Sequence, residues 1–272
     1  MGIPKDPCGF VCFMVTYSAI LYADYCIIIE VLLPTLIDSL WGTFHVVAFN
    51  IFIFLMVLSH IKASFTDPGK VPLPKIAVDF SEARRGSRKK KKGKTNDEWT
   101  VCKYCEMFRP PRAHHCRVCK RCIRKMDHHC PWINNCVGER NQKYFILFLF
   151  YTVLSTVYAV SLGVGTWSYK TNGFTRTQIE SRRLHIIVMF VVCVFFLLYV
   201  IWILYEQIYS VFHDTTMVEQ VQNTEDMSRS PKSKVALLTE VFGAGSYIKW
   251  LLPWNTSNTI HSHEGYEIVQ TV

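Results

Sequence analysis

The run Asp127-His128-His129-Cys130 places a carboxylate, two imidazoles and a thiol at consecutive positions of the chain. A thiolate is a strong nucleophile, and a neighbouring histidine both favours the thiolate and can take its proton. The same residue types also bind metal ions such as zinc. What this run does therefore depends on which of its residues a metal would use and which it would leave free.

The run lies near the end of a block that is rich in potential zinc ligands. The ligand-capable residues between positions 99 and 138 are Cys102, Cys105, His114, His115, Cys116, Cys119, Cys122, His128, His129, Cys130 and Cys136. A structural zinc site takes four ligands, commonly three cysteines and one histidine, and often begins with a Cys-x2-Cys pair. Two such sites would use six of the seven cysteines. We therefore predict two zinc sites and one cysteine that binds no metal.

Alternation along an extended strand indicates how the ligands divide. Neighbouring side chains point to opposite faces, so His115 and Cys116 should bind different metals, and the two sites should interleave along the sequence. The spacing leaves open which residues share a metal with Cys122. It also leaves open which histidine of each adjacent pair is bound.

Cys130 is the best candidate for the free cysteine. Because residues i and i+2 of a strand lie on one face, His128 can meet Cys130 while His129 turns toward a metal. Asp127 could then fix the tautomer of His128, which gives a nucleophile, a base and a residue that orients the base. On spacing alone the alternative stays open that Cys130 binds zinc and another cysteine is free.

Four apolar stretches flank this block, at residues 10–33, 44–61, 144–167 and 184–209. A helix of about 20 apolar residues spans the hydrocarbon core of a bilayer. We therefore predict an all-α membrane protein with four transmembrane helices and, between the second and third, a cysteine-rich domain that holds two structural zinc sites. The predicted parts are residues 1–66 (N-terminus and helices 1–2), 67–98 (basic linker), 99–143 (zinc-binding catalytic domain), 144–209 (helices 3–4) and 210–272 (C-terminal tail).

The distribution of positive charge predicts the orientation in the membrane. Residues 62–143 carry 21 of the 30 Lys and Arg against 8 acidic residues, whereas residues 34–43 carry no Lys or Arg. By the positive-inside rule the cysteine-rich segment is cytosolic, and four spans then place both termini in the cytosol as well. The basic residues in the loop 168–183 oppose this orientation without reversing it. In the reducing cytosol the cysteines favour metal binding or catalysis over disulfides.

The basic run at residues 84–94 has no apolar periodicity, which is typical of a solvated linker. The alternative is that this run binds the anionic lipid surface, with a binding free energy of about 1 kcal/mol for each basic residue near the surface. Four transmembrane helices argue against nucleic acid as a partner.

The cysteine-rich block resembles that of the DHHC-family protein S-acyltransferases, the palmitoyltransferases. The position of the block between the second and third of four spans agrees with that family, and Asp67-Pro68-Gly69 resembles its motif after the second span. Cys8-Gly9 before the first span looks most like the Golgi-located subgroup. The matching motifs are Cys102-x2-Cys105, His114-His115-Cys116-x2-Cys119-x2-Cys122, Asp127-His128-His129-Cys130-Pro131-Trp132 and Asn134-Asn135-Cys136-Val137-Gly138.

The resemblance implies a function for each part of the block. Cys130 would accept a long-chain acyl group from acyl-CoA as a thioester and pass it to a cysteine of a substrate protein, with His128 as base and Asp127 as its orienting residue. Two structural Zn²⁺ ions would be bound by Cys102, Cys105, His115 and Cys122 and by Cys116, Cys119, His129 and Cys136. The alternatives are a non-catalytic, membrane-anchored zinc-binding adaptor that recruits partners and a zinc-dependent ubiquitin ligase.

One motif departs from the family pattern. The family commonly carries Thr-Thr-x-Glu after the fourth span, whereas this chain has Thr216-Met217-Val218-Glu219. Any hydrogen bond from the second hydroxyl to the catalytic loop is therefore in doubt at Met217. Thr216 and Glu219 remain candidates for positioning that loop.

The predicted substrate partners are palmitoyl-CoA and proteins with membrane-proximal cysteines, in the bilayer of the Golgi or another endomembrane. Each buried methylene of an acyl chain contributes roughly 0.8 kcal/mol, so a tunnel among the spans should hold the chain. Phe148 and Ser155 share a face of the third span and, with Trp132, are candidates to line it. The candidate contacts for CoA phosphates are Arg121, Arg124, Lys125 and Lys143, and their alternative role is ordinary cytosolic charge.

Overall fold

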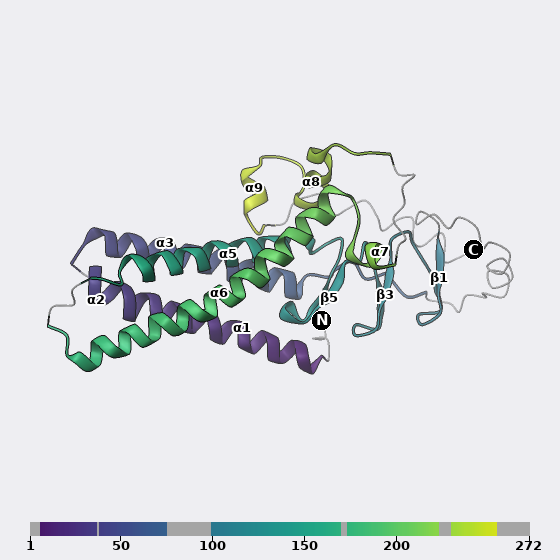
Figure 1. Cartoon of the computed structure of the whole chain (residues 1–272). Coiled ribbons are helices and arrows are strands. Elements are labelled where there is room, and N and C mark those ends of the chain that lie inside the picture. Colours follow the sequence, from purple (N-terminus) through teal and green to yellow (C-terminus); the bar gives the residue numbers. More distant parts are fainter. Residues whose placement is uncertain (1–5, 37, 75–98, 170–172, 223–229, 255–272) are drawn as a thin grey trace.

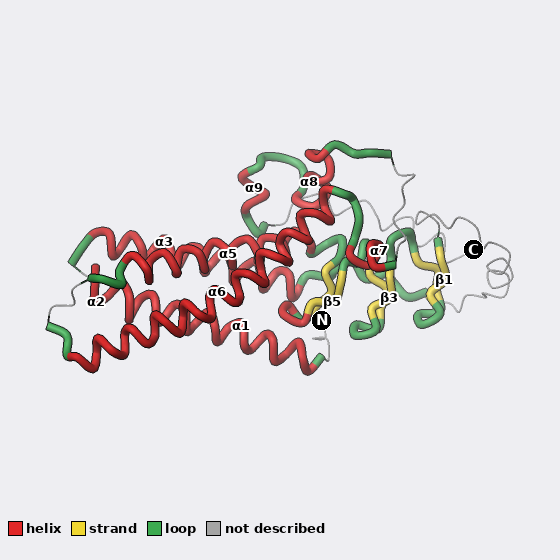
Figure 2. Tube along the Cα trace, viewed as in Figure 1, coloured by secondary structure: helices red, strands yellow, loops and turns green. Residues whose placement is uncertain are grey.

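The structure is a computed structural model that describes residues 6–36, 38–74, 99–169, 173–222 and 230–254 of the 272-residue chain. Helices form a long bundle, and short strands gather at one end of it (Figures 1 and 2). The basic run at residues 84–94 lies outside the described residues.

Among the described residues, four helical segments are long and apolar enough to cross a membrane, as predicted. The first comprises α1 (Pro7–Tyr25), the π-helix η1 (Cys26–Leu32) and α2 (Leu33–Leu36). The others are α3 (Leu40–Phe65), α5 (Gln142–Gly165) and α6 (Arg176–Phe212). Asp6, Ser39 and Thr175 accept hydrogen bonds from main-chain N–H groups in the first turns of α1, α3 and α6, so capping sets where these helices begin.

The outer faces of these helices suit a lipid environment. Phe54 on α3 and Phe195 and Trp202 on α6 are 61%, 73% and 64% exposed, which would be costly for a protein surrounded by water. Inside the bundle, α5 packs between α3 and α6, and its buried side chains include Phe145, Leu149 and Ala159. The helical bundle is therefore a membrane domain with its own core.

The cysteine-rich domain contains three antiparallel hairpins in succession. They pair β1 (Thr100–Cys102) with β2 (Met107–Arg109), β3 (His114–Cys116) with β4 (Arg121–Ile123) and β5 (His128–Cys130) with β6 (Asn135–Val137). The predicted all-α class thus holds for the membrane domain, whereas the cysteine-rich domain also contains short strands. A 3₁₀ turn, η2 (Pro131–Ile133), follows Cys130 directly.

Two asparagines attach the third hairpin to the helices. The Asn135 side-chain amide donates to the carbonyls of Ala63, Ser64 and Thr66 at 3.2, 3.0 and 3.0 Å, and that of Asn141 donates to Ala63 at 3.0 Å. The last carbonyls of a helix have no partner within the helix. Because these amides satisfy such carbonyls at the end of α3, Cys130 is held close to the ends of α3 and α5.

The turn Asp67-Pro68-Gly69 fixes the domain from the other side. Oδ1 of Asp67 accepts from the N–H groups of Gly69 and Lys70, each at 2.8 Å. Gly69 has φ of 104°, where a side chain would be strained, and its carbonyl accepts from Arg124 N–H at 2.9 Å. The Asp67-Pro68-Gly69 turn therefore links the second span to the strand domain.

In the described parts of the chain after α6 there are three short helices: α7 (Met217–Val221), α8 (Lys234–Phe242) and α9 (Ile248–Leu251). The α9 segment packs on α5, where the Tyr151 hydroxyl donates to the Leu251 carbonyl at 2.6 Å. Trp250 stacks on Phe242 of α8, with ring centroids 5.8 Å apart. The described part of the tail therefore folds back on the membrane domain.

Candidate active site and metal centres

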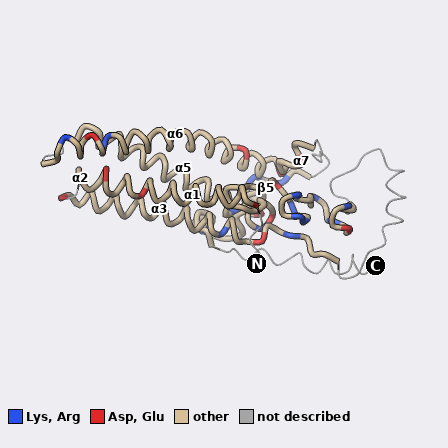
Figure 3. Tube along the Cα trace, turned by 90° about the horizontal axis from the view of Figure 1, so that it is seen from below, with Lys and Arg blue, Asp and Glu red and all other residues tan. Residues whose placement is uncertain are grey.

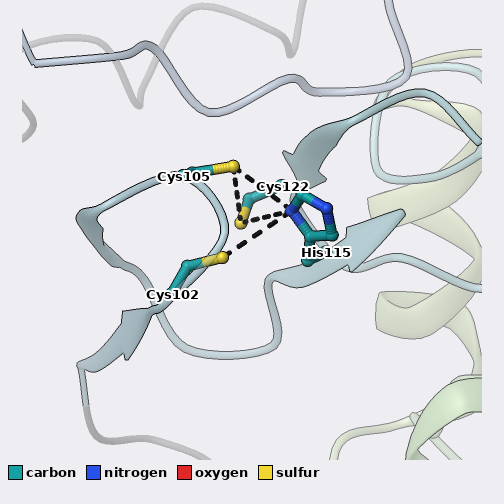
Figure 4. A group of neighbouring side chains, drawn as sticks. All are labelled: Cys102, Cys105, His115 and Cys122. Atoms are coloured by element: carbon teal, nitrogen blue, oxygen red, sulfur yellow. Dashed lines mark hydrogen bonds between the residues drawn. The ribbon is translucent and has the colours of Figure 1, made fainter. Parts of the chain in front are cut away.

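The first metal centre joins the first two hairpins (Figure 4). Nδ1 of His115 lies 3.7, 3.2 and 4.0 Å from the Sγ atoms of Cys102, Cys105 and Cys122. His115 and Cys122 are direct partners in the β3–β4 register, so the hairpin itself brings these two ligands together. The question that spacing left open for Cys122 is thereby answered.

The second metal centre joins the second and third hairpins. Nδ1 of His129 lies 3.4 and 3.6 Å from the Sγ atoms of Cys119 and Cys136, and these two sulfurs are 3.4 Å apart. Cys116 completes the group. His129 and Cys136 face each other across the β5–β6 ladder, as His115 and Cys122 do across the β3–β4 ladder.

Both groups fit a tetrahedral metal. The four ligand atoms of each group lie within 4.8 Å of one another. A zinc ion bound tetrahedrally at about 2.3 Å by sulfur and about 2.0 Å by nitrogen places neighbouring ligand atoms roughly 3.5–3.8 Å apart. The two predicted ligand sets are confirmed as clusters, and His115 and Cys116 belong to different ones. Cys130 belongs to neither.

Cys130 ends β5 beside His128 and Asp127. Its side chain is 5% exposed, and Asp127 is 1% exposed. Nδ1 of His128 donates to Oδ2 of Asp127 over 2.7 Å, and the imidazole also interacts with Cys130. The nucleophile, base and orienting carboxylate predicted from spacing are therefore brought together by β5 and the residue directly before it.

The electrostatics of this group favour a charged histidine beside the thiol. Burial opposes charge on both His128 and Asp127, but their mutual hydrogen bond outweighs it. The contact with Asp127 and the nearby Cys130 raise the pKa of His128 to about 9, and the contact with His128 holds the pKa of Asp127 below its usual range. A proton on the imidazole is the state that stabilises a thiolate at Cys130.

Asp127 has two further donors that sequence reasoning missed. The amide nitrogen Nε2 of Gln207 on α6 donates to Oδ2 over 2.7 Å, and the main-chain N–H of Met217 donates to Oδ1 over 2.9 Å. A polar residue near the end of an apolar helix was the available signal for Gln207. The Met217 contact removes the doubt about the missing hydroxyl, because the main chain supplies the donor.

Thr216 and Glu219 build the turn that presents this N–H. Oγ1 of Thr216 accepts from Glu219 N–H at 3.3 Å, and Oε2 of Glu219 accepts from Thr216 N–H at 2.8 Å, a capping box for α7. Glu219 is fully buried and pairs with Arg112 of the cysteine-rich domain at 2.8 Å. Arg112 also pairs with Asp214 at 2.7 Å. The segment after α6 is thus fastened to the cysteine-rich domain.

Residues of α1 and α3 contact the segment around Cys130 from the membrane side. Nε2 of His60 on α3 lies 3.0 Å from the Trp132 carbonyl, and Nδ1 of the same ring lies 3.2 Å from the Tyr17 hydroxyl. Oδ2 of Asp6 lies 3.4 Å from Nε2 of His129, on the side of the ring away from the metal ligands. Metal-binding histidines usually place their second nitrogen against a carboxylate or carbonyl in this way.

An apolar cavity of about 160 Å³ opens beside Cys130 within the helical bundle. Its lining includes Cys130, Trp132, Phe148 and Ser155. The candidate tunnel residues therefore do line one cavity, with Phe148 nearer to Cys130 along α5 and Ser155 two turns further in.

Three of the four cations proposed to bind CoA phosphates have protein partners. Arg124 pairs with Glu139 at 2.8 Å, and Lys125 lies 3.8 Å from Asp214. Lys143 is 5% exposed and donates to the carbonyls of Lys249 and Trp254 at 3.1 and 3.2 Å, so it fastens the tail to α5. Within the described residues, Nη1 of Arg121 is buried without a hydrogen-bond partner.

Comparison with known proteins places these features in a family. Residues 95–224 match the family model for the DHHC palmitoyltransferases. The chain is 36% identical to human palmitoyltransferase ZDHHC3 over 94% of its own length and 84% of the relative's. It is 35% identical to mouse palmitoyltransferase ZDHHC7 over 92% and 80%, and 30% identical to probable protein S-acyltransferase 12 of Arabidopsis thaliana over 95% and 92%. The chain therefore belongs to the DHHC palmitoyltransferase family of protein S-acyltransferases.

Proposed function

We propose that this enzyme moves a palmitoyl or similar long acyl chain from acyl-CoA to protein cysteines through a thioester on Cys130. The observation that carries the proposal is the position of Cys130. It lies outside both metal clusters, beside the His128–Asp127 pair and at an apolar cavity. Neither a zinc-binding adaptor nor a zinc-finger ubiquitin ligase with interleaved zinc sites needs a free thiol in this place.

The first step forms the acyl-enzyme. The Cys130 thiolate attacks the thioester carbonyl of acyl-CoA while His128 holds the proton that came from the thiol. The bond between the carbonyl carbon and the CoA sulfur breaks, and His128 returns the proton to the departing CoA thiolate. Asp127 keeps the His128 tautomer fixed and stabilises its positive charge.

The second step repeats this chemistry with a protein thiol. The incoming cysteine gives its proton to His128 and attacks the Cys130 thioester, and Cys130 leaves as a thiolate. One thioester is exchanged for another, so the step needs no further reactant. Substrate cysteines close to the bilayer fit this site, because β5, the strand that carries Cys130, lies beside the ends of the membrane helices (Figure 1).

Two Zn²⁺ ions are the metals we propose for the clusters, since Cys₃His sets suit zinc and leave no open position for catalysis. When bound there, zinc cross-links the hairpins that carry the catalytic residues. His129 and Cys136 then anchor Cys130 from both sides along the chain.

We propose that the protein lies in the membrane of the Golgi or another endomembrane. In the orientation we propose, the cysteine-rich domain and both termini face the cytosol. Charged residues are concentrated at the strand end of the molecule and at the opposite helix ends, with few between (Figure 3). Asp6, just before the first span, and Asp214, just after the fourth, both contact the cysteine-rich domain. These contacts support a position on the same side of the membrane for the chain segments before the first span and after the fourth.

Of the four cations proposed to bind the CoA phosphates, Arg121 is the strongest candidate, because its Nη1 has no hydrogen-bond partner within the described residues.

Ser155→Phe is expected to shift the enzyme toward shorter acyl-CoA substrates. A phenyl ring at this position would occupy cavity volume, and each methylene that no longer fits costs about 0.8 kcal/mol, roughly fourfold in affinity. Competition among acyl-CoAs of graded chain length measures the shift. Ser161→Phe is the matched control, because Ser161 lies on the same helix with its side chain exposed. An unchanged chain-length profile in Ser155→Phe would exclude this face of α5 from the acyl site.

A two-stage labelling experiment tests the function. Detergent-purified protein is incubated with labelled palmitoyl-CoA, freed of excess CoA ester, and mixed with a cysteine-containing acceptor peptide. We expect a hydroxylamine-sensitive label on the protein, release of an equal amount of CoA, and movement of the label to the peptide. Protein that binds palmitoyl-CoA without forming the thioester would support the adaptor instead.

A further inference from the structure

We infer that Gln207 is a positioning residue for catalysis, which acts by fixing the carboxylate of Asp127 and through it the imidazole of His128. The inference rests on the proposed catalytic roles of Asp127 and His128. It concerns a residue outside the cysteine-rich domain, 80 positions along the chain from Asp127.

The contacts of Asp127 carry the inference. Its Oδ2 accepts from both His128 Nδ1 and Gln207 Nε2, each over 2.7 Å, and its Oδ1 accepts from Met217 N–H over 2.9 Å. These three donors belong to β5, α6 and the start of α7, and they occupy both oxygens of the carboxylate, so they restrict its position and its rotation. With Nδ1 of His128 directed to Asp127, Nε2 is the nitrogen left for Cys130.

The two halves of the Gln207 amide show what the residue is needed for. The residue is 1% exposed, and its Oε1 has no hydrogen-bond partner within the described residues. A buried, unpaired carbonyl oxygen destabilises the fold, so an apolar side chain of similar size would serve packing better. The reversed amide would place an oxygen against the Asp127 carboxylate, and two acceptors repel. The useful part of Gln207 is therefore the N–H that it gives to Asp127.

The position of Gln207 on α6 connects Asp127 to the membrane domain. The same chain segment supplies Gln207 to one carboxylate oxygen and, after the turn at Asp214, Met217 to the other. Arg112 holds this segment to the cysteine-rich domain through Asp214 and Glu219. The end of α6 and the catalytic loop thus form one unit around Asp127.

The alternative is that Gln207 only stabilises a buried carboxylate and has no effect on the reaction. A double-mutant cycle separates the two, because residues that act through one another are non-additive. The full-length variants are Gln207→Met, which keeps side-chain length without a donor, Gln207→Glu, which keeps shape but presents a second carboxylate, Asp127→Asn, and Gln207→Met combined with Asp127→Asn. Gln178→Met at the opposite end of α6 is the matched control, since its side chain caps that helix far from Cys130.

The measurements are the single-turnover rate of Cys130 acylation at saturating palmitoyl-CoA, the KM for palmitoyl-CoA and the zinc content. Gln207→Met is expected to lower the rate by about 10–100-fold, by analogy with the loss seen when a side chain that orients a metal ligand is removed. KM and two zinc ions per chain should be retained. Gln207→Glu should lose at least as much, and Gln178→Met should keep the wild-type rate. In the Asp127→Asn background, Gln207→Met should cause little further loss.

Three results would overturn the inference. The first is a wild-type rate in both Gln207 variants, and the second is rate losses that multiply in the double variant. The third is a loss of rate that follows loss of zinc in both Gln207→Met and Gln207→Glu, which would assign Gln207 to folding instead. If the wild-type protein itself forms no thioester, the proposed catalytic roles fail before Gln207 is tested.

Discussion

Cys130→Ser is expected to abolish the hydroxylamine-sensitive acyl label and the transfer to acceptor peptides, while both zinc ions stay bound. Cys130 lies in neither metal cluster, so the substitution removes the nucleophile without removing a ligand. A serine hydroxyl is far less ionised than a thiol near neutral pH, and an oxygen ester would resist hydroxylamine. The measurement is the amount of labelled palmitate per chain before and after hydroxylamine.

Cys8→Ser is the control for this substitution, because Cys8 is a free, exposed cysteine of α1 that belongs to neither metal cluster and does not line the cavity beside Cys130. It should label as the wild-type protein does. A thioester label that persists in Cys130→Ser would remove the proposed nucleophile, and loss of zinc in that variant would mean that Cys130 is a ligand.

The second large effect is expected for Cys136→Ala. Cys136 clusters with Cys119 of the second hairpin and His129 of the third. Its strand, β6, pairs with β5, the strand that carries Cys130. Apparent zinc affinities in small domains correspond to about 10–16 kcal/mol, as much as the whole stability of a typical domain, about 5–15 kcal/mol. We therefore expect loss of the second metal, protease sensitivity of the cysteine-rich domain and no acyl label.

Metal analysis of the purified protein checks this prediction. The wild-type protein and Cys130→Ser should each bind two zinc ions per chain, and Cys136→Ala should bind one at most. A Cys136→Ala protein that keeps two zinc ions and the wild-type labelling rate would contradict the ligand assignment.

Much of the site could be predicted from sequence because its order is local. His129, Cys130 and Cys136 lie within one hairpin, where strand alternation alone separates the metal face from the nucleophile. The four spans were predictable for a similar reason, since length and hydropathy are properties of continuous segments. The partners of Cys122 were predicted only from the family resemblance, because spacing alone left open which residues share a metal with Cys122.

The long-range contacts could not be predicted in this way. Gln207 and Met217 reach Asp127 across 80 and 90 positions, and the packing of α6 against the cysteine-rich domain decides those distances. Sequence also identified Lys143 as a cation without showing that two main-chain carbonyls of the tail use it. A charge pattern indicates which groups are available, but the fold decides which of them already have partners.

Met217 shows a further difference between what the sequence predicted and what the structure contains. Its position in the motif predicted a missing side-chain hydroxyl, yet the contact to Asp127 uses the main-chain N–H that every residue except proline has. The capping box of Thr216 and Glu219 fixes where that N–H points. Motif comparison therefore identified the right segment and the wrong atom.

The most direct test of the central claim is to locate the acyl group among the eleven cysteines of the chain. Wild-type protein that has reacted with palmitoyl-CoA is digested under acidic conditions that preserve thioesters, and the peptides are analysed by mass spectrometry with and without hydroxylamine. We predict a hydroxylamine-sensitive palmitoyl group on the peptide that contains Cys130, which disappears when acceptor peptide is added. A thioester confined to other cysteines, with Cys130 unmodified throughout the reaction, would show that Cys130 is not the nucleophile.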